Sequence, residues 1–131
     1  MSPRDYVSAL TGARASVLPD GRIVISMDVL GDMRGLVTLT LAVDGPTATG
    51  TWALIVYYMD DPQSDAKPDG MMHGTVTAAT MRRSPQGRPA GVETAELVVV
   101  GGSRSFEGRT GFGRIGTWPH HPGGLTLILS F

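Results

Sequence analysis

The fold is decided by the stretch at residues 97–112, LVVVGGSRSFEGRTGF, which has the pattern of a strand, a glycine turn and a second strand. The apolar, β-branched run at 97–100 is typical of a strand. Gly101 and Gly102 interrupt this run, and a second segment extends from Phe106 to Phe112 with further glycines. The stretch therefore predicts a β-hairpin, and it indicates fold more directly than function.

Segments with the same rhythm occur on both sides of this hairpin, where apolar and polar residues alternate between turns rich in glycine and proline. Eighteen glycines and nine prolines fit many short strands joined by turns. The expected strands cover residues 13–18, 22–30, 36–43, 48–59, 71–83, 92–100, 108–118 and 125–131. Polar loops are expected at 60–70 and 84–91, and residues 1–12 are expected to form a loose arm.

Eight strands in series, with no room for the long crossovers of parallel pairs, predict antiparallel neighbours. Closure into a barrel removes the exposed edges of such a sheet. A chain of 131 residues is typical of one domain. We therefore expect an all-β fold, an eight-stranded antiparallel up-and-down β-barrel formed as a single domain by residues 1–131, with a lumen wide enough for side chains or one small ligand.

Composition argues against several classes of function. The formal net charge is −1 and the charges are scattered along the chain, so no basic patch predicts nucleic-acid binding. The chain has no cysteine, and its longest apolar run, at 52–59, is too short to span a membrane. The spacing of His73, His120 and His121 matches no metal-site signature. We therefore expect a cytoplasmic protein with no metal, cofactor, nucleic-acid or membrane partner.

The glycine hairpin resembles that of the dirigent and allene oxide cyclase barrel family, through Gly101, Gly102, Ser103, Phe106 and Gly111. The resemblance implies a barrel whose lumen holds a small, mostly apolar molecule. Dirigent proteins steer radical coupling, allene oxide cyclases close a ring, and similar bacterial barrels, such as spirotetronate-pathway Diels–Alderases, catalyse cyclisations. The resemblance implies that none of this chemistry needs a cofactor in the barrel.

The chain differs from dirigent proteins at two places, where an acidic residue and an arginine are replaced by Ser105 and Thr110. This difference argues against radical steering. The leading hypothesis is a cofactor-free cyclase or isomerase that folds a reactive, mostly apolar natural-product intermediate in its lumen, since positioning alone lowers much of a barrier. The alternatives are a lipocalin-like protein that binds a hydrophobic ligand without changing it, and a homo-oligomer, dimer or trimer, in which the outer face of the barrel matters most.

Few polar side chains interrupt the apolar strand faces. If Phe112 faces inward, the period of two places Arg114 on the same face, where Glu96 on the neighbouring strand is its candidate partner; the alternative is an outward ion pair. Tyr58 could donate a hydrogen bond to a substrate, or simply place its hydroxyl at the rim. The candidate catalytic residues are thus Tyr58, Arg114 and Glu96. The candidate substrate-binding residues are Met27, Trp52, Leu54, Val56, Met81, Thr110, Phe112 and Trp118.

Overall fold

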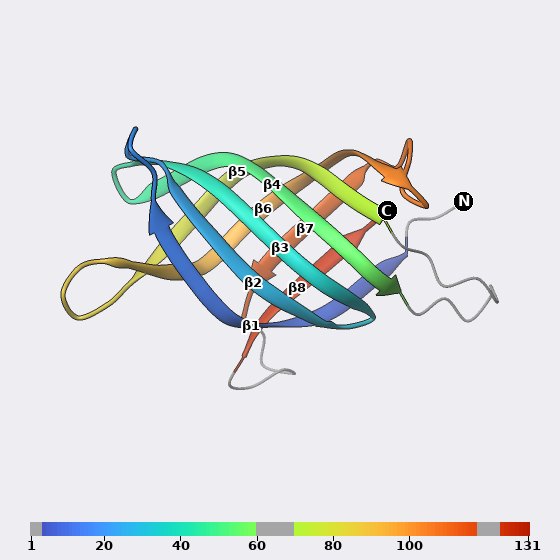
Figure 1. The fold of residues 1–131 in the computed structure, drawn as a ribbon, viewed down its shortest axis with the longest axis horizontal. Helices are drawn as coiled ribbons and strands as arrows, with labels where there is room; N and C mark the ends of the chain where they lie inside the picture. The colour runs from blue at the N-terminus through green and yellow to red at the C-terminus, as the bar shows by residue number, and fades with distance from the viewer. Residues whose placement is uncertain (1–3, 60–69, 118–123) are drawn as a thin grey trace.

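A computed structural model describes residues 4–59, 70–117 and 124–131. These residues form eight antiparallel strands and no helix, and the last strand pairs with the first to close a barrel (Figure 1). The strands are β1 (Asp5–Val17), β2 (Ile23–Gly31), β3 (Met33–Asp44), β4 (Thr47–Met59), β5 (Gly70–Arg83), β6 (Pro89–Arg104), β7 (Gly111–Gly116) and β8 (Leu125–Ser130). The predicted all-β, eight-stranded up-and-down barrel is confirmed. Within the described ranges, no helix could cross a membrane.

The prediction of a loose arm at residues 1–12 is wrong for the residues from Asp5 onward. Strand β1 begins at Asp5, and Tyr6, Ser8 and Leu10 are buried while they pair with β8. The hydroxyl of Ser8 accepts a hydrogen bond from the backbone N–H of Met33 at 3.2 Å, so this polar residue is satisfied inside the barrel. Because Ser8 takes an inward position between Tyr6 and Leu10, the segment lacks the strict alternation of apolar and polar residues that predicts a strand.

The core fills the interior of the barrel, because every strand turns alternate side chains inward. On β2 the inward residues are Ile23, Ile25, Met27 and Val29, all of which are buried. Strand β3 continues the layer with Val37, Leu39 and Leu41, which are fully buried. The period of two at residues 22–30 and 36–43 therefore predicted the inner face of these strands correctly.

Trp52 on β4 connects three strands in the middle of the barrel. Its indole N–H crosses Gly74 on β5 and donates a hydrogen bond to the carbonyl oxygen of Val98 on β6, at 3.0 Å. A Cβ at Gly74 would collide with that carbonyl and would lie 2.9 Å from the indole nitrogen. The glycine is therefore required for the ring to lie across the strand.

One end of the barrel is closed by aromatic rings, and we call it the aromatic end. Tyr6 of β1 stacks on Phe131 with ring centroids 4.8 Å apart, and the ring of Phe106 meets Phe131 edge-on at 6.0 Å. Phe106 lies in the turn between β6 and β7 and is 1% exposed. The hairpin at residues 97–112 thus folds its own phenylalanine back over the end of the core.

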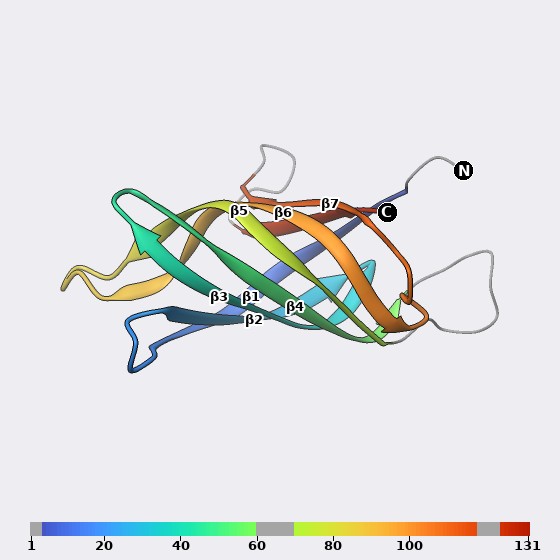
Figure 2. The same cartoon turned by 90° about the horizontal axis from the view of Figure 1, so that it is seen from above.

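At the other end, the described strands leave a gap in the barrel wall, which we call the notch. Strand β8 pairs with β1 only as far as Leu10, and β7 pairs with β6 only from Ala95 to Val99. Beyond these points β1 continues to Val17, and β6 begins as early as Pro89. The β1–β2, β3–β4 and β5–β6 hairpins therefore project past the short strands β7 and β8 (Figures 1 and 2).

Candidate functional site

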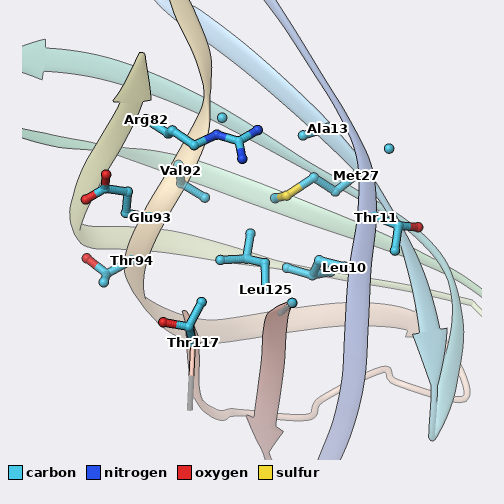
Figure 3. Close-up of a pocket in the computed structure, with 13 residues that line it drawn as sticks. Leu10, Thr11, Ala13, Met27, Arg82, Val92, Glu93, Thr94, Thr117 and Leu125 are labelled. Atoms are coloured by element: carbon cyan, nitrogen blue, oxygen red, sulfur yellow. The ribbon is translucent and has the colours of Figure 1, made fainter. Parts of the chain in front are cut away.

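A cavity of about 710 Å³ opens at the notch. The residues that line it come from β1, β2, β5, β6 and the facing ends of β7 and β8 (Figure 3). They are Leu10, Thr11, Gly12, Ala13, Met27, Arg82, Gly91, Val92, Glu93, Thr94, Thr117, Gly124 and Leu125. The cavity exists because β7 and β8 stop short of the hairpins on either side of them.

The floor of the cavity is apolar and continuous with the core. Leu10, Met27 and Val92 are buried members of the core cluster, and Leu125 is half-buried against it. Gly91, which is also buried, adds no side chain to the wall of β6. A molecule in the cavity would therefore contact hydrocarbon on its inner side, which favours an apolar group there.

The rim is polar, and its two charged residues point in different directions. Arg82 on β5 extends its guanidinium over the cavity toward Ala13 on β1, whereas the carboxylate of Glu93 is directed the other way (Figure 3). Thr11, Thr94 and Thr117 add hydroxyl groups around the opening. The site thus combines an apolar floor with a cationic group on one side, an arrangement suited to an amphipathic small molecule.

Of the predicted substrate-binding residues that the structure describes, only one lines this cavity. Met27 forms part of its floor. Trp52, Leu54 and Val56 face the interior as expected, but they pack in the core away from the cavity lining. Met81 is half-buried against the same core and also lies outside the lining.

Strand β7 has the opposite orientation from the one predicted. Phe112 is 69% exposed, while Gly113 and Ile115 face the interior. A Cβ at Gly113 would lie 2.6 Å from Cδ2 of Leu129, so a larger residue there would require the Leu129 side chain to shift. The prediction assigned the inward face to Phe112 because it is aromatic, whereas the inward position is occupied by Gly113.

The lumen role expected for Arg114 and Glu96 is wrong for the same reason. Their pairing across β6 and β7 is confirmed, with Nε of Arg114 3.6 Å from Oε2 of Glu96. Both side chains are more than half exposed, so the ion pair lies on the outer surface, as in the outward alternative. Glu96, Phe112 and Arg114 line a shallow outer groove rather than the interior.

Tyr58 does not share the inward face of Trp52 and Leu54. A register shift between β3 and β4 pairs Gly35 with Val56 but Arg34 with Tyr58, so one residue of β4 is extra at this point. Tyr58 therefore lies opposite the exposed Arg34, and Met59 takes the buried position. The bulge, which shifts the alternation by one residue, explains the incorrect prediction.

The remaining predicted positions lie outside the cavity or outside the described residues. Thr110 is exposed in the turn before β7. Trp118, His120, His121 and most of the loop predicted at 60–70 lie outside the described residues. Among the residues that are described, no three His, Asp or Glu side chains come close enough to form a metal site.

The sequence reasoning missed most of the cavity. Leu10 was placed in the arm, and Gly91 was placed in a loop although β6 begins at Pro89. Val92 and Leu125 were predicted in strands, but nothing in the local pattern shows that their neighbours β7 and β8 end early. The asymmetry of lengths, with two short strands beside two long ones, appears only in the structure, because the sequence predicts a longer strand at 108–118 and a shorter one at 13–18.

The outer surface of the barrel carries several exposed apolar side chains, including Ile55, Tyr57 and Phe112. Ile55 pairs with Met71 across β4 and β5, so part of this apolar surface is continuous between strands. A homo-oligomer that covers such a surface stays a prediction.

Comparison with known proteins assigns no family to the chain, because no family model, curated protein or solved structure matches it. The resemblance to the dirigent and allene oxide cyclase family stays a prediction. The shape and chemistry of the notch cavity are therefore the basis for a functional proposal.

Proposed function

We propose that this barrel binds a small, mostly apolar molecule in the notch cavity. The observation that carries the proposal is an open cavity of about 710 Å³ whose floor is made of core side chains. Its volume lies within the range of roughly 300–1,000 Å³ that is typical of small-molecule sites. Leu125, the half-buried residue of the floor, leaves apolar surface in water, and a ligand that covers it removes that surface from solvent.

The direct test is calorimetric titration with decanol, a neutral apolar probe, against the parental protein and against Ala13→Trp. Ala13 lines the cavity and is exposed, so the indole should fill the opening without replacing a core residue. We expect saturable binding by the parental protein and at least about a tenfold loss in affinity for Ala13→Trp.

Ser16→Trp is the matched control, because Ser16 lies on the same strand, is exposed and does not line the cavity. Its affinity should equal that of the parental protein. Leu125→Trp provides a second filling variant if circular dichroism shows that Ala13→Trp is unfolded. Equal affinities in the parental protein and a folded filling variant contradict the proposal, as does the absence of binding to the parental protein.

Cofactor-free ring closure is the second candidate function. It is favoured by hydrogen-bond donors beside an apolar floor, the guanidinium of Arg82 and the hydroxyls of Thr11 and Thr117, whereas the hydroxyl of Thr94 is hydrogen-bonded to that of Thr80 at 2.7 Å. Confinement against the floor would hold the reacting atoms of a flexible molecule near each other, and the donors would stabilise a developing oxyanion. A polyunsaturated or epoxide ligand should then cyclise faster, and with one product stereochemistry, in the presence of the protein. An unchanged rate and product mixture would rule out catalysis, and binding would be the only function that remains.

A further inference from the structure

We propose that the ligand of the notch cavity carries a single carboxylate, and that Arg82 is the residue that selects it. The inference rests on the proposed function, since it names the class of small molecule that the cavity takes. It is drawn from the position and the partners of one arginine at the rim.

Arg82 lies opposite a glycine of the neighbouring strand. Arg82 on β5 pairs with Gly91 on β6. Its Nη2 atom lies 3.6 Å from the place that a Cβ at Gly91 would occupy, and its Nε atom lies 3.8 Å from that place. The guanidinium therefore lies close to β6 at Gly91 and extends across the notch toward Ala13 (Figure 3).

Arg82 differs from Arg22 and Arg83, two other arginines of this end of the barrel, in its partners. Arg22 binds the carboxylate of Asp20, and Arg83 donates to the carbonyl oxygen of Gly87 at 3.0 Å. Across the part of the chain that the structure describes, no hydrogen bond or ion pair engages the guanidinium of Arg82. A guanidinium has five N–H donors in a planar fork that matches a carboxylate, so Arg82 offers this fork to a ligand.

The charges at the rim favour a monoanion. Among the described residues of the lining, Arg82 and Glu93 are the charged ones, and their formal charges cancel. With both residues charged, a bound carboxylate brings the net formal charge of the rim to −1, whereas a phosphate dianion brings it to −2 and is the less favourable ligand. The apolar remainder of the ligand would then lie on Leu10, Met27 and Val92, which form the floor.

The test compares two probes with ten-carbon chains, decanoate and decanol, by calorimetric titration at neutral pH. We expect decanoate to bind the parental protein about 10- to 100-fold more tightly than decanol, because hydrogen bonds to a charged group are the stronger kind. Arg82→Met, which keeps a long apolar side chain, should bring the two affinities together by weakening decanoate alone. Arg82→Lys should retain part of the preference, because it keeps the charge and loses the fork.

Arg83→Met is the matched control, since Arg83 is the next residue of β5, is exposed and does not line the cavity. It should keep the full preference for decanoate. If the parental protein binds both probes equally, or if folded Arg82→Met keeps the preference, the carboxylate inference is overturned while the cavity proposal stands. If the parental protein binds neither probe, both fail.

Discussion

At the aromatic end of the barrel, residues that are far apart in the sequence close the core, whereas at the notch end each hairpin is held by bonds within its own turn. Tyr6, Phe106 and Phe131 meet at the aromatic end. At the same end, the backbone N–H of Val7 donates to the carboxylate of Asp32 at 2.9 Å, which ties the β2–β3 turn to β1. These contacts join segments from the beginning, the middle and the end of the described chain.

Two turns at the notch end are held by hydrogen bonds between residues of the same turn. In the β1–β2 turn, the backbone N–H of Gly21 donates to the carbonyl of Leu18. In the β5–β6 turn, the hydroxyl of Ser84 accepts a hydrogen bond from the backbone N–H of Arg88 at 3.2 Å. These bonds lie within each turn, and β7 and β8 do not extend between β1 and β6 at this end of the barrel. The barrel thus separates the end that stabilises the fold from the end that offers a site.

The largest effect expected from this difference is the loss of Phe106. Phe106→Ala removes a buried ring from the aromatic end and should lower the free energy of unfolding by about 3–5 kcal/mol. Phe112→Ala removes a ring that is 69% exposed on the outer face and should lower it by less than about 1 kcal/mol. Equilibrium denaturation in urea measures both. Equal losses would show that the ring of Phe106 does not close the core.

A smaller effect should distinguish two glycines of β6, one at each end. A Cβ at Gly102 would collide with the carbonyl oxygen of Met71 and would lie 2.8 Å from Cβ of Phe106. A Cβ at Gly91 would meet its nearest atoms, on Ala13 and Arg82, at 3.6 Å, an ordinary van der Waals distance. Gly102→Ala should therefore destabilise the fold by about 1–3 kcal/mol.

Gly91→Ala should change the free energy of unfolding by less than about 1 kcal/mol in either direction, since alanine also restricts the unfolded chain. Thermal and urea denaturation of the two variants give the comparison. If Gly91→Ala is the more damaging substitution, the notch end is packed more tightly than the aromatic end and the proposed site is not open.

The architecture could be predicted from the sequence because strand rhythm is a local property. Alternation along the chain, clearest at 22–30 and 36–43, together with the turn residues between segments, indicates eight antiparallel strands. Closure into a barrel follows because it covers the exposed edges of the sheet. The exceptions were positions where a small or polar residue faces inward. Ser8 on β1 and Gly113 on β7 are such positions, and at both the neighbouring strand decides which residue fits.

The candidate site could not be predicted, because it depends on relations between strands. The outward turn of Tyr58 follows from a bulge opposite Gly35, and a one-residue shift moves a side chain to the other face. The cavity itself follows from where β7 and β8 end relative to β1 and β6. The place of Arg82 at the cavity rim depends on its pairing with Gly91 across β5 and β6, which the local sequence does not show.

The smallest effect concerns Asp20 in the β1–β2 turn of the notch end. Its carboxylate accepts hydrogen bonds from the backbone N–H of Arg22 at 3.0 Å and from Nε of the same arginine at 2.8 Å. The backbone N–H first, and then the guanidinium, hold the pKa of Asp20 below its ordinary value. Because the pKa is lower in the folded state than in the unfolded state, the charged carboxylate stabilises the turn above the unfolded-state pKa.

This stabilisation should be lost as the pH falls below about 4 and through the folded-state pKa of Asp20. It should be slight, because the carboxylate is exposed to solvent and screened. An NMR titration of the Asp20 carboxyl should give a pKa below the ordinary range, and Asp20→Asn should remove the small acid-dependent part of the thermal stability. Arg22→Met should raise the pKa only in part, because the backbone donor remains. An ordinary pKa in the parental protein would mean that bonds within the turn do not hold this hairpin, and the contrast between the two ends would be weaker than the structure indicates.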